Sequence, residues 1–251
     1  MPTPIIIANW KMSLGVSASV KLALAISNKL AGLKNKEVIL CPSFSSLYSV
    51  GELIKKTKLK LGAQNVFWQE RGAYTGEEAP ATLRELGCEY VIVGHSERRQ
   101  NIFETDEMIH NKIRACLENK LTPILCVGET YAERQGGYAN DAVFYQLIKS
   151  LSGLTLSGSR QLIIAYEPVW VIGSGRAIEP LEAARAFRLI HRTLYDLWPE
   201  RVIKKHIRIV YGGSVDAKNA AAFARLEFFS GFLVGGSSLK VEEFSGIVKA
   251  I

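Results

Sequence analysis

The chain has 251 residues, of which 48% are hydrophobic and 22% charged, and its formal net charge at pH 7 is +7. This composition is ordinary for a globular protein with a large core, and no apolar run reaches the roughly 18 residues that cross a bilayer. The basic residues are dispersed, their small clusters at 55–58 and 204–206 contain no aromatic residues, and no nucleic-acid-binding motif is present. We therefore expect neither nucleic acid nor a membrane as partner, and a mild field that favours small anions.

Eight short apolar runs with β-branched and aromatic residues predict strands. They lie at 5–9, 37–41, 59–65, 90–94, 121–128, 161–167, 206–211 and 228–234. Amphipathic helical patterns lie between them, at 17–30, 46–56, 80–86, 105–119, 140–151, 180–198, 216–226 and 241–249. Near-continuous apolar strands that alternate with helices indicate a parallel sheet covered by helices. Because eight such units in about 250 residues fit a closed barrel, we predict an α/β fold, a (β/α)8 barrel that forms a single domain over residues 1–251.

The main alternative fold is an open, doubly wound sheet. The absence of a Gly-x-Gly-x-x-Gly motif after the first strand counts against a dinucleotide-binding member of that class. The N-terminal residues lack the basic segment of a signal peptide. The four cysteines make no CxxC pair, so we expect reduced thiols in a cytoplasmic protein.

The stretch 165–176 organises the rest of the chain. Glu167 stands where a buried strand should end, and Pro168 cannot donate a hydrogen bond to a neighbouring strand. The loop that follows is apolar at 169–172 and ends in a Gly-Ser-Gly tip, which is typical of a hinged lid over a reaction site. We predict such a lid at 168–178; the alternative is a longer strand with a bulge at Pro168.

Polar residues or glycine turns follow most of the predicted strands. They are Asn9 and Lys11, Gln64 and Asn65, His95 and Glu97, Glu129, Glu167, and the Gly-Gly-Ser turns at 212–214 and 235–237. In a barrel these strand ends meet at one mouth, where the catalytic groups of the fold gather. Glycine N–H groups beside a helix N-terminus suit phosphate, and the loops after strands seven and eight are its common position. The two glycine turns therefore predict a phosphate site, with two simple tight turns as the alternative.

These residues resemble the triosephosphate isomerase family of TIM barrels. The resemblance is carried by Asn9-Trp10-Lys11, Gly62-Ala63-Gln64-Asn65, Gly72-Ala73-Tyr74-Thr75-Gly76-Glu77, His95-Ser96-Glu97-Arg98-Arg99, Cys126-Val127-Gly128-Glu129, Ala165-Tyr166-Glu167-Pro168-Val169-Trp170, Tyr211-Gly212-Gly213-Ser214 and Leu233-Val234-Gly235-Gly236-Ser237. Val171, Ser174 and Arg176 stand where the family often has Ala, Thr and Lys, and the run 78–80 is less typical. These departures remove no catalytic group but leave open the lid kinetics and the contacts near a subunit interface.

The resemblance implies an isomerase that interconverts dihydroxyacetone phosphate and D-glyceraldehyde 3-phosphate through an enediol(ate), in glycolysis and gluconeogenesis, without cofactor or metal. Such a reaction needs a base, an electrophile at the oxygens and a holder for the phosphate. The resemblance implies Glu167 as the base and His95 as a neutral electrophile and proton shuttle. It implies Lys11 as the counter-charge to phosphate and enediolate, Asn9 as a holder of the oxygen side, and Glu97 as a group that orients Lys11 or His95 or pairs with an arginine. The implied N–H donors to the phosphate are Gly173, Ser214, Gly235 and Gly236.

The loop at 67–79 is unusually long for a connection between a strand and its helix. The family resemblance implies a homodimer, and we expect this loop to dock into a second copy of the chain near Lys11 and His95. A small phosphorylated triose is the other expected partner. Four remaining groups are expected to have no catalytic role: Cys126 as a small buried residue, and His110, His191 and His206 as structural or solvated side chains.

Three other functions remain open on the residues alone. Lys11 could form a Schiff base in an aldolase, although nothing beside it in the sequence would activate the amine. A metal-dependent enolisation would need three carboxylates at the strand ends, which the sequence lacks. A catalytically silent barrel could serve as a binding scaffold.

Overall fold

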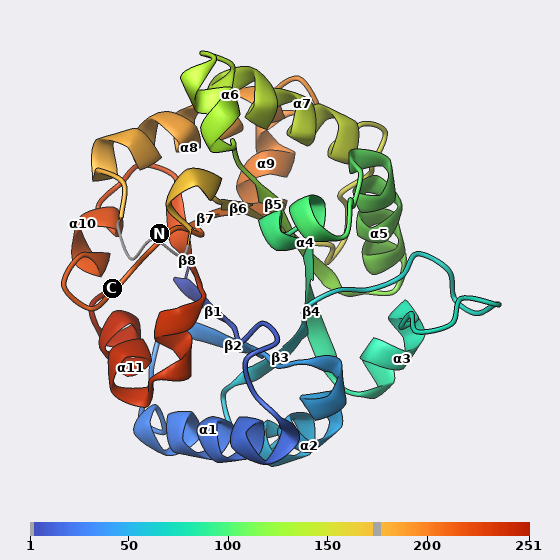
Figure 1. Ribbon diagram of the computed structural model, residues 1–251, viewed down its shortest axis with the longest axis vertical. Helices are drawn as coiled ribbons and strands as arrows, with labels where there is room; N and C mark the ends of the chain where they lie inside the picture. Colours follow the sequence, from blue (N-terminus) through green and yellow to red (C-terminus); the bar gives the residue numbers. More distant parts are fainter. Residues whose placement is uncertain (1–2, 173–176) are drawn as a thin grey trace.

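The computed structural model describes residues 3–172 and 177–251 of the chain. Within these residues eight parallel strands pair in chain order and close into a barrel, as predicted (Figure 1). The strands are β1 Ile5–Asn9, β2 Glu37–Cys41, β3 Lys60–Ala63, β4 Cys88–Val93, β5 Thr122–Val127, β6 Leu162–Tyr166, β7 Ile207–Tyr211 and β8 Phe229–Val234.

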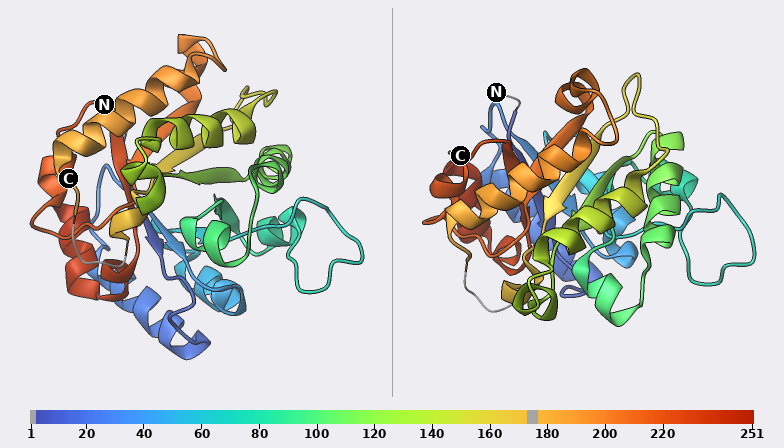
Figure 2. Two further views of the ribbon diagram at one scale, coloured as in Figure 1. Left: turned by 45° about the horizontal axis from the view of Figure 1, so that its top comes forward. Right: turned by 90° about the horizontal axis from the view of Figure 1, so that it is seen from above.

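A ring of helices surrounds the barrel (Figure 1). They are α1 Val16–Lys29, α2 Phe44–Ile54, α3 Pro80–Glu85, α4 Ser96–Asn101, α5 Asp106–Glu118, α6 Tyr131–Gln135, α7 Ala139–Leu151, α8 Pro180–Leu194, α9 Glu200–His206, α10 Ala220–Phe223 and α11 Val241–Lys249, with two 3-10 turns, η1 Val169–Val171 and η2 Gly236–Leu239. None of the described helices is long and apolar enough to cross a membrane. The segment between β3 and α3 projects away from the body (Figure 2).

The barrel closes where β1 meets β8. Ile5 lies opposite Glu37 on one side and opposite Gly231 on the other. Gly231 has φ +148°, and a Cβ atom at this position would lie 1.8 Å from the carbonyl oxygen of Ile5. A glycine is therefore needed here for the last strand to approach the first.

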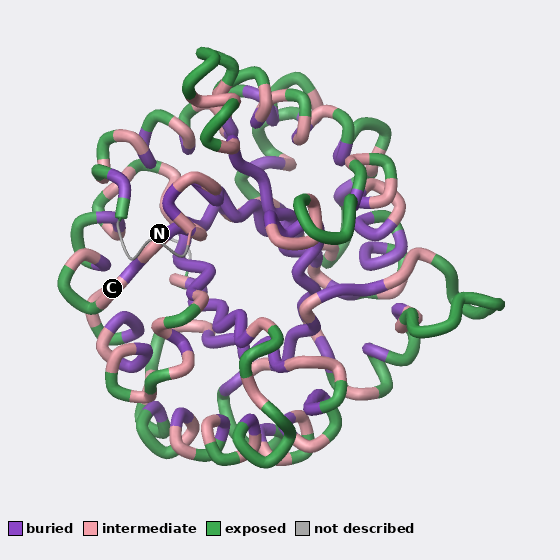
Figure 3. The backbone as a smooth tube through the Cα atoms, in the orientation of Figure 1, coloured by how far each residue is buried: buried purple, intermediate pink, exposed green. Residues whose placement is uncertain are grey.

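Alternate strand residues fill the inside of the barrel and the others pack against the helices. The interior cluster consists of Ile5, Ile7, Ile39, Cys41, Tyr90, Ile92, Ile124, Cys126, Ile163, Ala165, Val210 and Leu233. The strands are buried while the outer faces of the helices are exposed (Figure 3). The barrel is thus a packed core, which leaves its ends for chemistry.

Polar side chains close the N-terminal end of the barrel. The Tyr90 hydroxyl donates a hydrogen bond to Glu37 Oε1, and Arg208 Nη1 donates to Glu37 Oε2 at 3.0 Å. Burial and then the hydrogen bond and charge of Glu37 raise the pKa of Tyr90, so the phenol stays neutral and acts as a donor. The three groups at this end therefore satisfy one another.

The structure corrects the prediction for the segment 180–211. Helix α8 ends at Leu194, before the predicted end at 198, and a separate helix, α9, follows Pro199. His206 is the last residue of α9 and does not begin a strand, contrary to the prediction. The segment 204–206 is the last turn of this helix, where basic residues complement the helix dipole.

Three further differences concern short elements. Helix α6 was not predicted, and it begins with a capping box formed by Thr130 and Glu133. Helix α10 covers four residues of the predicted 216–226. Strand β6 ends at Tyr166 and the chain then forms η1, so the alternative of a longer strand bulged at Pro168 is wrong.

Candidate active site

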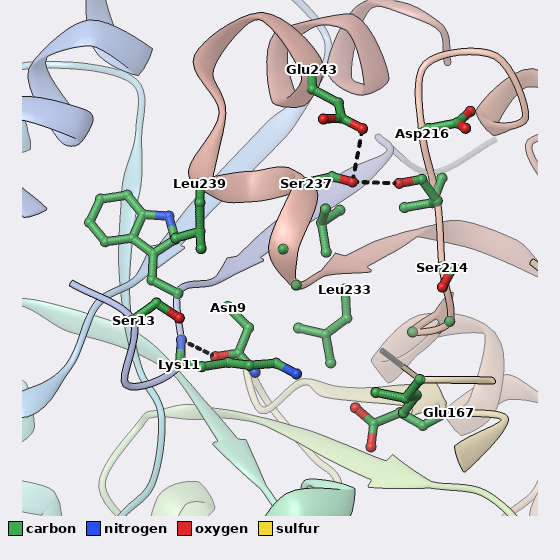
Figure 4. Close-up of a pocket in the computed structure, with 18 of the residues that line it drawn as sticks. Asn9, Lys11, Ser13, Glu167, Ser214, Asp216, Leu233, Ser237, Leu239 and Glu243 are labelled. Carbon is green, nitrogen blue, oxygen red and sulfur yellow. Dashed lines mark hydrogen bonds between the residues drawn. The ribbon is translucent and has the colours of Figure 1, made fainter. Parts of the chain in front are cut away.

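The C-terminal ends of the strands surround a cavity of about 470 Å³ (Figure 4). The predicted site residues that line it are Asn9, Lys11, His95, Glu167, Ser214, Gly235 and Gly236. Glu97 lies beside the cavity and contacts two of these side chains. Gly173, the remaining predicted phosphate ligand, lies outside the described residues.

Glu167 and His95 face each other in the cavity. Glu167 is 2% exposed, and its Oε1 atom lies 3.1 Å from His95 Nε2. Its Oε2 atom accepts a hydrogen bond from the backbone N–H of Ser96 at 3.0 Å. The carboxylate therefore has a donor on each oxygen, although burial removes it almost completely from water.

The backbone of α4 determines which nitrogen of His95 carries a proton. His95 is the N-cap of this helix, and its Nδ1 atom accepts a hydrogen bond from the N–H of Glu97 at 3.2 Å. An accepting nitrogen carries no proton, so the hydrogen of a neutral imidazole lies on Nε2 and points at Glu167. In this tautomer the imidazole can donate a hydrogen bond from Nε2 into the cavity.

The Lys11 side chain reaches from β1 to two parts of the site. Its Nζ atom lies 2.5 Å from Glu97 Oε1, and a Cβ atom placed on Gly235 would lie 3.8 Å from the same nitrogen. Among the described ion pairs, Glu97 pairs with this lysine and not with an arginine. Arg98 and Arg99 pair instead with Glu104 and Asp106.

The backbone of Lys11 is strained and is held on both sides. Its φ is +51°, a value that residues other than glycine rarely adopt. Asn9 Oδ1 accepts a hydrogen bond from the Lys11 N–H at 3.0 Å, and Gln64 Nε2 donates one to the Lys11 carbonyl at 2.8 Å. Sequence reasoning noted Gln64 at a strand end but assigned it no role. The signal was its place in the Gly-Ala-Gln-Asn motif.

Two glycines make room for Glu167. A Cβ atom on Gly128 would lie 1.7 Å from the carbonyl oxygen of Glu167, and one on Gly212 would lie 2.9 Å from its Cγ atom. The N–H of Glu167 donates to Val127 O and the N–H of Gly212 donates to Tyr166 O, each at 2.8 Å. Glu167 thus lies between the ends of β5 and β7 at a distance that side chains in place of the two glycines would not allow.

The comparisons with known proteins agree with this geometry. A model of the triosephosphate isomerase family matches residues 4–251. The chain belongs to this family. Triosephosphate isomerases of Dictyoglomus turgidum and Herpetosiphon aurantiacus are 42% and 45% identical to it, over 100% and 99% of each chain respectively. The crystal structure of triosephosphate isomerase from Bartonella henselae superposes with a TM-score of 0.89 at 32% identity, covering 99% of this chain and 98% of that one.

Membership in the triosephosphate isomerase family decides the reaction. The protein interconverts dihydroxyacetone phosphate and D-glyceraldehyde 3-phosphate, a step of glycolysis and gluconeogenesis. The aldolase and scaffold alternatives are therefore set aside. The ion pair between Lys11 and Glu97 agrees with this, because a Schiff-base amine is activated by burial or by a neighbouring cation.

Glu129, one of the polar residues that follow the predicted strands, is buried beside the site and has several partners. It is 2% exposed and accepts hydrogen bonds from the Tyr166 hydroxyl at 3.1 Å and from Trp170 Nε1 at 2.8 Å. The guanidinium of Arg134 lies 4.2 Å from the centre of the Trp170 ring. Burial and then the charge of Glu129 raise the pKa of Tyr166, which keeps the phenol a donor. The end of β6 and the first residues of the predicted lid are thus anchored to the loop after β5.

Cys126 packs inside the barrel, as expected. It is 1% exposed, and burial followed by the charge of Glu167 raises the pKa of its thiol well above the usual value. A thiol held neutral in this way is a poor nucleophile. Among the described residues, no group of three or more His, Cys, Asp or Glu side chains is placed to hold a metal ion.

Proposed function

We propose that Glu167 is the base of the isomerase reaction, that His95 is its electrophile and proton shuttle, and that Lys11 neutralises the charge of phosphate and enediolate. The observation that carries this assignment is the 3.1 Å contact between Glu167 Oε1 and His95 Nε2, inside a cavity that also holds Lys11 and the glycine turns. Asn9 supports Lys11 through the Lys11 backbone, and Glu97 orients its ammonium group.

The groups account for each proton that moves. Glu167 exchanges its contacts with Ser96 and His95 for substrate and takes a proton from C1 of dihydroxyacetone phosphate. The electrons of that C–H bond form the C=C bond of the enediolate, and the charge on the C2 oxygen is stabilised by the His95 Nε2–H and by Lys11. His95 moves a proton between the two oxygens, and Glu167 returns its proton to C2, which yields glyceraldehyde 3-phosphate.

Isotope exchange tests the assignment of the base. In heavy water the protein should exchange deuterium into the substrate at the reacting carbon, because the proton held by Glu167 equilibrates with solvent. The variant Glu167→Gln should lose this exchange but should still bind inorganic phosphate, since the phosphate site lies on other loops. Exchange at the wild-type rate in the variant would reject Glu167 as the base.

We further propose that Ser214, Gly235 and Gly236, with Gly173 from the lid, donate backbone N–H groups to the phosphate. Ser214, Gly235 and Gly236 line the same cavity as Lys11. A Cβ atom on Gly236 would meet no atom of the described residues within 4 Å, so the space beside it is free for a ligand. The position after β7 and β8 is the usual phosphate site of the fold.

The segment 168–178 is proposed to act as a lid that excludes water from the enediolate, which otherwise loses phosphate. The anchoring of Trp170 by Glu129 supports a fixed hinge on the N-terminal side of this segment. Replacement of Trp170 by Phe removes the donor to Glu129 and should raise phosphate elimination relative to isomerisation, measured as free phosphate released per turnover.

We propose that the protein is a homodimer formed through the loop at 67–79. Apolar side chains are exposed on this loop and beside the site: Tyr74 is 45% exposed, Met12 96%, Ile102 59% and Phe103 80%. Met12 follows Lys11, while Ile102 and Phe103 follow α4. The projecting loop is stiffened from within, because Phe67 stacks on Trp68 and the Phe67 N–H donates to Glu78 O. A second copy would cover these groups.

Sedimentation at micromolar concentration tests the dimer. The variant Tyr74→Glu should sediment as a monomer and lose activity. The matched control is Tyr145→Glu, on α7, where the tyrosine is similarly exposed at 56%. A fully active wild-type monomer at this concentration would contradict the proposal.

The protein is also proposed to be cytoplasmic. Its four cysteines, Cys41, Cys88, Cys116 and Cys126, are free and buried, which fits a reducing compartment. Fractionation of cells with an antibody to the chain tests this location.

A further inference from the structure

The loops after β7 and β8 carry the glycine turns at 212–214 and 235–237. Both loops extend beyond the paired part of β7 and β8 before they reach the proposed phosphate site. The pairing between β7 and β8 is irregular and its last register pair joins Tyr211 to Phe232. Beyond this point the Gly212 N–H donates a hydrogen bond to Tyr166 O at the end of β6. At the far end of the same loop, Asp216 Oδ1 accepts hydrogen bonds from the N–H groups of Lys218 and Asn219. Neither of these sets of hydrogen bonds fixes the middle of the loop relative to η2.

Ser237 supplies a link between the two. Its Oγ atom donates a hydrogen bond to the carbonyl oxygen of Val215, in the loop after β7, at 3.0 Å. Among the described residues, this side chain provides the hydrogen bond that crosses from η2 to the other glycine loop. Ser237 lines the cavity but lies on the far side of the loops from Glu167 (Figure 4).

Glu243 competes for the same hydroxyl hydrogen. Its Oε1 atom lies 3.3 Å from Ser237 Oγ, and it sits in the first turn of α11, where the helix dipole favours an ionised carboxylate. A serine hydroxyl has one hydrogen, so the bond to Val215 and the bond to Glu243 share it. The partial exposure of the Glu243 side chain, 33%, leaves it on the rim of the anion-binding cavity.

We propose that Ser237 is a positioning residue for the phosphate of the substrate. Its hydroxyl holds the loop after β7 against η2, so that the backbone N–H groups of both loops converge on one anion, and Glu243 weakens this link. The inference rests on the assignment of the phosphate to the two glycine loops. Ser237 touches neither the reacting carbons nor their oxygens. Its loss should therefore weaken the binding of the substrate and of the transition state equally.

Inhibition by inorganic phosphate at constant ionic strength tests the proposal, together with KM and kcat. The variant Ser237→Ala should raise the inhibition constant of phosphate and KM in parallel, by about three- to tenfold, which is the effect of one hydrogen bond. Its kcat should stay within about twofold. Ser237→Thr keeps the hydroxyl and should restore both constants.

Glu243→Gln should act in the opposite direction and lower the inhibition constant. The glutamine amide can donate to Ser237 Oγ, which leaves the hydroxyl hydrogen for Val215, and the variant removes a negative charge near the anion. A loss of stability would weaken binding in both variants, so opposite signs separate positioning from a general defect. The matched control is Ser245→Ala, which deletes a hydroxyl that bonds to Val241 O within α11 and should leave both constants unchanged.

Gly236→Ala separates failure of this inference from failure of the phosphate assignment. Among the described residues the added methyl group meets no atom within 4 Å, so its effect falls on the bound anion. The role of Ser237 is overturned if Gly236→Ala weakens phosphate binding while a folded Ser237→Ala variant binds phosphate as the wild type does. Equal weakening by Ser245→Ala and Ser237→Ala overturns it as well. If neither Gly236→Ala nor Ser237→Ala changes the inhibition constant, the anion does not lie between the loops and the phosphate assignment fails.

Discussion

Ionisable side chains lie at both ends of the barrel, near its axis, but their surroundings differ. At the N-terminal end, Glu37 is paired with Arg208 and Tyr90, and the set closes the barrel. At the C-terminal end, Glu167 and His95 face a cavity of about 470 Å³ and keep room for a ligand between themselves and the opposite loops. At the N-terminal end long side chains form hydrogen bonds with one another, whereas at the C-terminal end glycines leave room in the cavity. Whether such groups serve closure or catalysis thus depends on the residues that follow the strands.

The largest effect is expected when the base at the open end is removed. The variant Glu167→Gln should lower kcat by about 10²- to 10⁴-fold, the usual contribution of a general base. The fold should survive, because the glutamine oxygen can still accept from the Ser96 N–H. Steady-state kinetics and circular dichroism measure the two properties. Activity within tenfold of the wild type would mean that another group takes the proton.

A smaller loss is expected when the space around the base is filled. In Gly212→Ala the new Cβ atom would lie 2.9 Å from Glu167 Cγ, so the base must move, and a displacement of this kind costs up to about 10²-fold in kcat. Gly32→Ala is the control, since a Cβ atom there meets nothing within 4 Å. Equal kinetics in the two variants would show that the glycine is not needed for the position of the base.

The closed end should respond in stability and not in catalysis. Arg208→Met leaves the carboxylate of Glu37 with one partner and should lower the free energy of unfolding by about 1–3 kcal/mol. Activity should remain within about twofold, because this pair lies at the end of the barrel opposite the cavity. Urea denaturation and kinetics test both statements. The double variant Glu37→Gln/Arg208→Met should recover part of the loss, since it leaves no unpaired charge.

The smallest effect is expected for Tyr90→Phe. This change removes the hydroxyl donor to Glu37 but leaves its ion pair with Arg208, and should cost about 1 kcal/mol in the free energy of unfolding. The same denaturation experiment measures it. A drop in kcat with unchanged stability would contradict the division of roles between the two ends.

The sequence predicted the barrel, and the predicted residues Asn9, Lys11, His95 and Glu167 do lie around one cavity. Strand β1 and helix α11 lie where the pattern placed them, because apolar periodicity is a local property of the chain. The boundary at His206 was missed, because the end of α9 carries basic residues in place of an apolar period. Gln64 and Glu129 were noticed as strand-end residues without a role, since their partners lie far away in the sequence.

The order of strands and helices, and the position of Glu167, His95 and Lys11 at one mouth, could be predicted from local patterns and from the rule that parallel strands end on the same face. The family was indicated by the resemblance of whole motifs. The tautomer of His95, the strained backbone of Lys11 and the clearance that Gly128 gives to Glu167 became visible in the folded barrel alone. Each of these depends on distances between atoms that the closed barrel brings together, and distances of that kind are not encoded in any single stretch of the chain.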